Sequence, residues 1–135
     1  MSTTMGWVEV YVVFVVSHLV GDYLFQTDWQ AMHKHGGLAG DPEARRALLA
    51  HVTTYTLAFV PALIWLADDL GGGVAWVAAL VFVPHLIQDD GRLIKAYMLR
   101  VKKCDPAVAP SVAAMVDQTF HMATLFGLAL LTTAV

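Results

Sequence analysis

The stretch HLVGD at residues 18–22 decides the predicted fold, because the chain repeats it as HLIQD at residues 85–89. In each copy a histidine and an aspartate lie four residues apart, so on a helix both side chains point to the same face, about one turn apart. Asp117 and His121 have the same spacing in the reverse order. All three pairs lie in apolar segments, and an ionisable side chain buried in lipid is costly and usually functional.

The composition is typical of a membrane protein. Of the 135 residues, 58% are hydrophobic and 14% are charged, whereas an average soluble domain is about 45–50% apolar and about 25% charged. The few basic residues form no long stripe with interleaved aromatic side chains, which argues against a nucleic-acid partner. The single cysteine, Cys104, excludes an internal disulfide framework. Residues 1–9 carry no Lys or Arg, so we expect the first apolar run to be a retained transmembrane helix rather than a signal peptide.

Four apolar runs predict an all-α, four-transmembrane-helix bundle that forms one integral membrane domain over residues 1–135. The expected spans are residues 5–26, 47–66, 74–95 and 111–133. Each is close to the roughly 20 residues that cross a hydrocarbon core of about 30 Å. Asp41 followed by Pro42 predicts the start of the second helix, and the DDLGGG sequence at residues 68–73 predicts a short turn.

The distribution of Lys and Arg sets the predicted orientation. Three lie in or beside the first connection and five lie in or beside the third, whereas both termini and the middle turn have none. They are Lys34, Arg45, Arg46, Arg92, Lys95, Arg100, Lys102 and Lys103. The positive-inside rule then predicts cytoplasmic first and third connections, with both termini on the outer side of the membrane.

Seven ionisable residues inside the spans lie at two matched depths. At 1.5 Å per residue, the distances from the cytoplasmic span ends are about 8 Å and about 15 Å. The shallow layer holds Asp22, His51, Asp89 and Asp117, and the deep layer holds His18, His85 and His121. An unpaired charge costs about 2.5–3.5 kcal/mol at the bilayer centre, and a cation removes the repulsion between carboxylates. The sequence therefore predicts that all seven bind one or two divalent metal ions, with Zn, Mn or Fe favoured by the imidazole and carboxylate ligands.

The leading functional hypothesis is a membrane-embedded metal-dependent hydrolase. Seven ligands exceed what one tetrahedral ion needs, so two ions about 3.5–4 Å apart are an alternative to one. Asp22, His51 and Asp117 are the candidate general bases or acids. Arg92 and Lys95 are candidates for attracting the negative charge of a lipid headgroup ester or phosphoester, and they equally suit a role as positive-inside anchors.

Further polar residues lie beside the predicted ligands. Gln26, Asp28 and Gln118 are candidates for orienting the histidines through hydrogen bonds. His33 and His35 lie in a polar connection beside glycines and are expected to be solvated.

Two other functions remain open from the sequence. Intramembrane His and Asp residues also mark ion paths, so a transporter or carrier of divalent metal ions or protons is the first alternative. Such a path needs polar residues that continue outward, and the outer halves of the spans offer few. The second alternative is a non-enzymatic, phage-type membrane interaction or pore protein in which the polar residues only join helices. Pairing of bundles into a homo-oligomer is also left open.

The repeated His/Asp motif suggests an internal duplication, in which the first two spans match the last two in the same orientation. The ligands would then lie at the shared axis of the bundle, as in soluble carboxylate-bridged metal proteins.

The order of these motifs resembles a family of small bacterial and phage membrane proteins known as domain of unknown function family 3307. The resemblance rests on His18-x-x-x-Asp22, Gln26-Thr27-Asp28-Trp29, His51, His85-x-x-x-Asp89 and Asp117-Gln118-x-x-His121. It covers nearly the whole chain and implies a polytopic protein of a bacterial inner (cytoplasmic) membrane. In the family pattern a lysine stands where this chain has Arg92, which keeps the charge but not the amine. More loosely, the pattern is similar to that of predicted membrane-bound metal-dependent hydrolases.

Overall fold

The computed structural model describes residues 5–134, and within that range the chain is helical and contains no strand, as predicted. Three short π- or 3-10-helical segments, labelled η, interrupt the α-helices. In chain order the elements are α1 (Trp7–Leu19), η1 (Val20–Phe25), α2 (Asp28–His33), η2 (Gly37–Ala39), α3 (Pro42–Ala58), α4 (Val60–Leu70), η3 (Gly71–Gly73), α5 (Val74–Asp89), α6 (Arg92–Arg100) and α7 (Pro110–Thr133).

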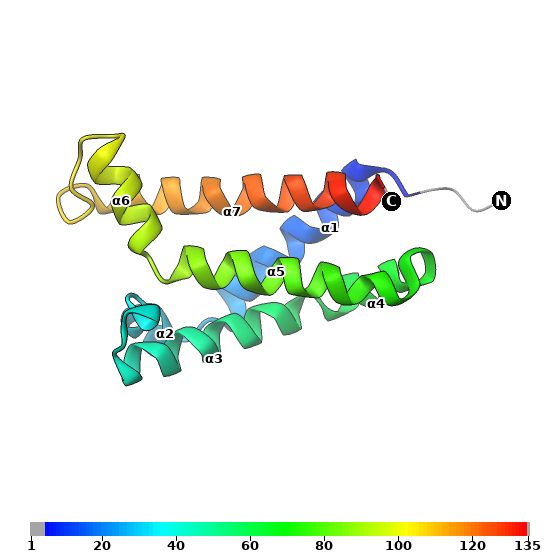
Figure 1. Ribbon diagram of the computed structural model, residues 1–135, viewed down its shortest axis with the longest axis horizontal. Helices are drawn as coiled ribbons and strands as arrows, with labels where there is room; N and C mark the ends of the chain where they lie inside the picture. The colour runs from blue at the N-terminus through cyan, green and yellow to red at the C-terminus, as the bar shows by residue number, and fades with distance from the viewer. Residues whose placement is uncertain (1–4, 135) are drawn as a thin grey trace.

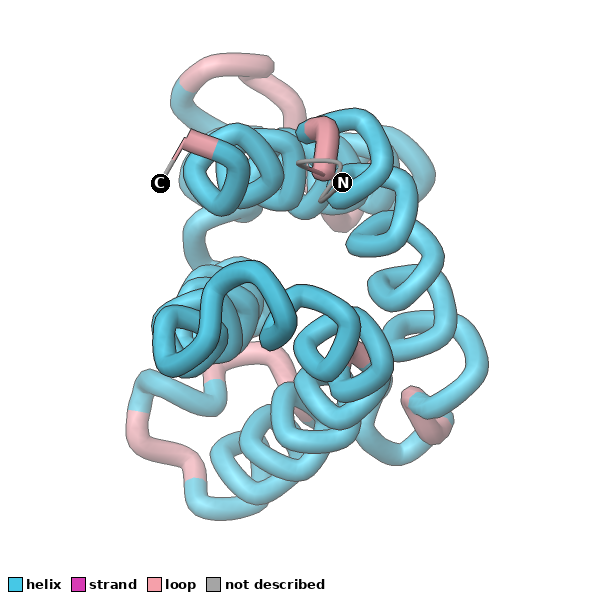
Figure 2. Tube along the Cα trace, turned by 90° about the vertical axis from the view of Figure 1, so that its right-hand side faces the viewer, coloured by secondary structure: helices cyan, strands magenta, loops and turns pink. Residues whose placement is uncertain are grey.

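Four long helical rods lie side by side (Figure 1). They are α1 with η1, α3 with α4, α5, and α7. The rods form a closed ring, because α7 contacts α1 and α5, while α3 contacts both α5 and η1; Figure 2 views this arrangement along the rods. α1 begins and α7 ends at one end of the molecule, and α2 and α6 lie at the other (Figure 1).

Three helical segments are long and apolar enough to cross a membrane: Trp7–Phe25, Val60–Asp89 and Pro110–Thr133. The chain reverses within the second of these, since α4 and α5 contact each other on either side of the glycine turn η3. The first and fourth predicted spans agree with α1–η1 and α7. The expected second span, residues 47–66, is instead divided between α3 and α4 at Phe59. The nearby Pro61 has no N–H to continue the hydrogen bonding of α3.

The third predicted span is too long. Residues 74–95 were expected to be one helix, but α5 ends at Asp89. Gly91 has a φ of +81°, in the left-handed region that a glycine adopts without strain, and it turns the chain into α6. Helix α6 packs Ile94 and Met98 against Val116 of α7. Asp41 caps α3 as predicted, since its side chain accepts a hydrogen bond from the Glu43 N–H at 3.0 Å.

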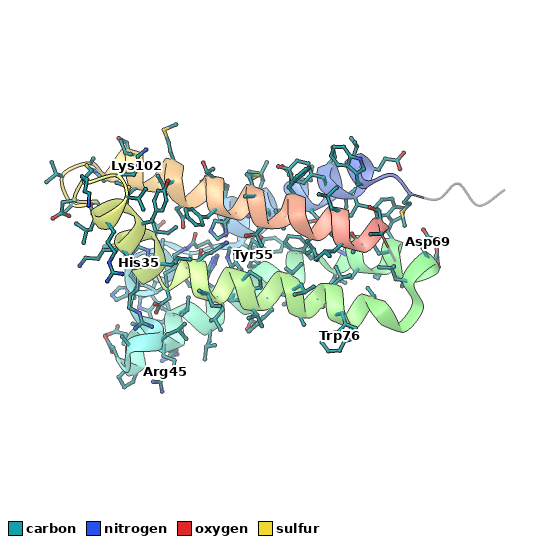
Figure 3. The ribbon with its side chains drawn as sticks, turned by 45° about the horizontal axis from the view of Figure 1, so that its top comes forward. His35, Arg45, Tyr55, Asp69, Trp76 and Lys102 are labelled. Carbon is teal, nitrogen blue, oxygen red and sulfur yellow. The ribbon has the colours of Figure 1, made fainter. Side chains whose placement is uncertain are left out.

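The two ends of the molecule differ in polarity. At the end where α1 begins, an apolar core fills the space between the rods, with Phe14, Phe59 and Leu125 among its members. Basic side chains lie at the opposite end, as Figure 3 shows for Arg45 and Lys102, while Asp69 lies at the first end. Large apolar side chains also cover the outside of the rods, among them Val12, Val16, Leu57, Ile64, Trp76, Val83, Ile87 and Leu131. Such an extensive exposed apolar surface is consistent with contact with a lipid bilayer.

Candidate metal centre

All seven predicted ligands lie in one cluster between the rods. They come from four rods: His18 from α1, Asp22 from η1, His51 from α3, His85 and Asp89 from α5, and Asp117 and His121 from α7. All four histidines and Asp89 are buried. Three groups of these residues have ligand atoms close enough to share an ion. The seven residues that the sequence predicted at two matched depths therefore lie close together in the structure.

The tightest group holds Asp22, His51, His85 and Asp89. Their four facing atoms are two Nε2 nitrogens and two carboxylate oxygens. The Nε2 atoms of His51 and His85 are 3.0 Å apart. His51 Nε2 lies 2.7 Å from Asp89 Oδ2 and 3.3 Å from Asp22 Oδ1. His85 Nε2 lies 3.3 Å from both of these oxygens. An ion with ligands at about 2.0–2.1 Å in a tetrahedron has ligands about 3.3–3.4 Å apart, so these atoms have nearly the spacing of a tetrahedral site.

A π-helical turn presents Asp22 to this group. Such turns are rare and frequently occur at functional sites, and here η1 starts one residue before the buried Gly21. The glycine lets η1 approach α3 closely, since a Cβ at this position would lie 2.6 Å from Tyr55 Cδ2 and 3.2 Å from Tyr55 Cα. The close packing of Gly21 on Tyr55 therefore sets the distance between Asp22 and His51.

Tyr55 belongs to the cluster, although the sequence analysis did not select it. Its ring stacks on His85 with centroids 3.4 Å apart and planes 5° apart, and Figure 3 places it between the rods. Nδ1 of His85 has no hydrogen-bond partner within residues 5–134, so this stacking and the contacts of Nε2 hold the imidazole in orientation. The available signal was the position of Tyr55 four residues after His51, on the same face of α3.

His18 lies in the cluster with both ring nitrogens occupied. Nε2 is 3.0 Å from Oε1 of Gln118, which can only accept, so Nε2 donates. In the neutral ring Nδ1 then accepts from the Tyr55 hydroxyl at 3.1 Å. This arrangement places Gln118 where the sequence predicted an orienting side chain. His18 also belongs to one of the three groups that could hold an ion, with His85 and His121, so its role as a ligand stays a prediction.

Lys34 also reaches the cluster, although it lies in the first connection. Its Nζ is 2.6 Å from Asp89 Oδ2, and its side chain is only 12% exposed. With its amide oxygen turned toward Nζ, Gln26 accepts from Lys34 at 2.8 Å, and its amide nitrogen donates to the Asp22 carbonyl at 3.1 Å. The buried Asp90 holds this loop, since Gly36 N–H donates to its carbonyl and Leu38 N–H to its carboxylate, both at 2.8 Å. No sequence spacing indicates this placement, because it depends on how the loop folds back.

The remaining predicted residues lie outside the ligand group. Asp28 is exposed in the first turn of α2, where the chain leaves the bundle after Gln26, so it does not contact the histidines. Arg92 pairs with Asp90 rather than with a predicted ligand. Lys95 is exposed on α6. His33 stacks on Trp29 at the surface and His35 is exposed, in agreement with the expectation that both are solvated.

An open pocket of about 600 Å³ lies beside the cluster at the basic end of the molecule. Arg92, Lys95 and His35 line it, together with the carboxylates of Asp90 and Asp117 and apolar residues of α6 and α7. Asp117 is 31% exposed, and its Oδ1 is 3.6 Å from His121 Nε2. Because Asp117 both lines the pocket and contacts a buried histidine, it links the pocket to the ligand cluster.

Comparison with sequence families gives one match, to the family described as "Protein of unknown function (DUF3307)", over residues 10–135. The match includes every residue of the cluster and confirms the resemblance drawn from the motifs. Comparisons with curated proteins and with solved structures give no match.

Proposed function

We propose that this chain, which belongs to the DUF3307 family, is a membrane-embedded metal-dependent hydrolase. Its proposed substrate is a phosphoester, or another ester, of a lipid headgroup. The observation that carries the proposal is the near-tetrahedral spacing of the Asp22, His51, His85 and Asp89 ligand atoms. That group lies beside a pocket with basic residues on its wall.

The imidazole and carboxylate ligands favour a divalent ion that is intermediate between hard and soft metals. Two imidazoles and two carboxylates suit Zn²⁺, Mn²⁺ or Fe²⁺ better than metals that prefer thiolates. Bound there, such an ion would supply Lewis acidity to a phosphoryl or carbonyl oxygen and make water a nucleophile at neutral pH. The chain's own contribution is to hold the ligands: Tyr55 fixes the His85 ring, and Gln26 bridges Lys34 and the main chain of Asp22.

The pocket residues have distinct proposed roles. Asp117 is the carboxylate that faces the pocket, so it is the best placed of the three candidates to accept a proton from attacking water. Asp22 and His51 are engaged with the ligand group instead. Lys95 would attract an anionic headgroup to the pocket, and Arg92, whose charge is paired with Asp90, would contribute less. The pocket lies at the end rich in Lys and Arg, where a headgroup in the cytoplasmic leaflet would lie.

The apolar end of the molecule argues against a transporter. The hydroxyls of Thr54, Thr56 and Ser17 donate to carbonyls of their own helices, so their hydrogens are not available to other partners. Beyond the cluster, the space between the rods is filled by apolar side chains such as Phe14, Phe59 and Leu125. A site that opens toward one face fits catalysis on a molecule from that face.

Cys104 provides a test of the proposed topology, in which all four rods cross the bilayer and both termini lie outside. It is the only cysteine in the chain and lies in the connection between α6 and α7. A membrane-impermeant maleimide should label it in inside-out vesicles and not in spheroplasts. A Cys104→Ser, Asp69→Cys variant should show the opposite pattern. Labelling of Cys104 from outside the cell would overturn the topology.

The test of function combines metal content with hydrolysis. Detergent-purified protein should contain bound divalent metal and hydrolyse a fluorescent phospholipid or a nitrophenyl phosphate, with activity lost on chelation and restored by Mn²⁺ or Zn²⁺. His51→Gln should lose both metal and activity, whereas the matched control His33→Gln, at an exposed stacked histidine, should keep both. Lys95→Ala should raise KM with little change in kcat, because it weakens substrate attraction only. Absence of metal from every preparation would favour the non-enzymatic alternative.

A further inference from the structure

We infer that the cluster holds a second divalent ion, bound by Asp89, Asp117 and His121 and bridged to the first through the carboxylate of Asp89. This inference rests on the proposed function and extends it. The second ion would lie between the first ion and the pocket, where it would face the substrate.

The two oxygens of Asp89 face different sets of ligands. Oδ2 points toward His51 and His85, at 2.7 and 3.3 Å from their Nε2 atoms. Oδ1 points toward His121, at 3.0 Å from its Nε2 atom. A carboxylate whose oxygens serve two ligand groups is placed to bridge two ions, which in two-metal hydrolytic sites lie about 3.5–4 Å apart.

His121 supplies independent support for a ligand at this position. The residue is only 2% exposed, and its Nε2 makes no hydrogen bond within the described part of the chain. That nitrogen nevertheless faces Asp89 Oδ1 at 3.0 Å and Asp117 Oδ1 at 3.6 Å. The nitrogen and the two carboxylate oxygens lie within ion-pair distance but form no aligned hydrogen bond, and a cation coordinated by all three atoms would satisfy them together.

The group of Asp89, Asp117 and His121 faces the pocket, whereas the group that holds the first ion is enclosed by protein. Asp117 lies on the pocket wall, so an ion held by its Oδ1, the oxygen that faces His121, would keep coordination positions for a ligand from the pocket and leave Oδ2 to accept a proton. This is the usual arrangement of a catalytic ion, whereas the first ion, with four protein ligands, would have to expand to five-coordination to bind water or substrate.

The charge of the cluster indicates the class of substrate. Asp22, Asp89 and Asp117 with the ammonium of Lys34 leave two negative charges when the histidines are neutral. One divalent ion would neutralise them, and two would leave two positive charges beside the pocket. A phosphate monoester dianion would balance these two positive charges. Two ions can also stabilise both the attacking and the leaving oxygen during its hydrolysis. We therefore assign phosphate monoesters, rather than neutral carboxylic esters, as the preferred substrate class.

Manganese provides a test that does not depend on activity. Protein stripped of metal and titrated with Mn²⁺ should bind two ions per chain, and its electron paramagnetic resonance spectrum should show the exchange-coupled signal of a manganese pair. His121→Gln should bind one ion and give an uncoupled signal. Asp117→Asn, at a position that is 31% exposed, should weaken the second ion by more than the roughly 10–100-fold that loss of an orienting residue causes, while keeping the first. His33→Gln should retain the coupled pair.

The possible results separate this inference from the proposed function. One tightly bound ion with an uncoupled signal in the unaltered protein would overturn the second site and leave the first intact. Two coupled ions that persist in both His121→Gln and Asp117→Asn would overturn the ligand assignment. Absence of any bound Mn²⁺, Zn²⁺ or Fe²⁺ would overturn both. Faster hydrolysis of a carboxylic ester than of nitrophenyl phosphate by the two-ion form would overturn the substrate class.

Discussion

Replacement of Asp89 by asparagine is expected to abolish metal binding, because this carboxylate contacts three histidines at once. Loss of a residue that merely orients a ligand weakens metal binding by about 10–100-fold, so removal of a shared ligand should weaken it more than 100-fold. Metal analysis of the purified variant after dialysis would measure the loss. The matched control is Asp28→Asn, because Asp28 is exposed and lies outside the cluster; its metal content should be unchanged.

The same substitution should also destabilise the metal-free protein, since it leaves the ammonium of Lys34 without its partner at 2.6 Å. Breaking a buried ion pair from one side typically costs about 3–5 kcal/mol, and the partial exposure of Lys34 places the expected loss at the lower end. Addition of Lys34→Met removes the unpaired charge and should recover most of that stability, as measured by thermal unfolding in detergent. Metal binding should not return in the double variant. Recovery of both properties would contradict the assignment of Asp89 as a ligand.

Replacement of Gly21 by alanine is expected to disrupt the centre without altering any polar group. The added Cβ would lie 2.6 Å from the Tyr55 ring and 3.2 Å from its Cα, so η1 and α3 would have to separate. Overpacking of this kind typically costs about 1–3 kcal/mol. Because Asp22 follows Gly21 directly, its oxygen would also move away from His51 and His85. We expect a lower unfolding temperature together with weaker metal binding.

Gly127 provides the matched control for this substitution, because it also lies in a long apolar helix and a Cβ there would meet no atom within 4 Å. Gly127→Ala should be neutral or stabilise the protein by up to about 1 kcal/mol, the difference in helix propensity. Equal effects of the two substitutions on metal binding would show that the Gly21–Tyr55 contact does not position Asp22.

Several features were predictable because they depend only on position along one helix. The spacing of His85 and Asp89 places both on one face of α5, and the depths of the seven residues follow from counting along each span. The Asp41 cap and the glycine turn at η3 are equally local, and both are present. The breaks at Phe59 and Gly91 were missed. The spans were predicted from hydropathy, which does not detect the breaks that Pro61 and Gly91 introduce into an apolar helix.

The amino-acid sequence alone determined the helical class, the apolar surface and which imidazoles and carboxylates share a depth, since hydropathy and helical period are properties of neighbouring residues. Only the tertiary structure decided which atoms face one another. The rotation of each helix about its axis is set by contacts between distant segments, such as Gly21 against Tyr55. Those contacts place Tyr55 on His85, bring Lys34 to Asp89 and direct the two oxygens of Asp89 toward different histidines. Counting along one helix gives the depth of a side chain but not its direction, and the direction is what brings these imidazoles and carboxylates face to face as candidate metal ligands.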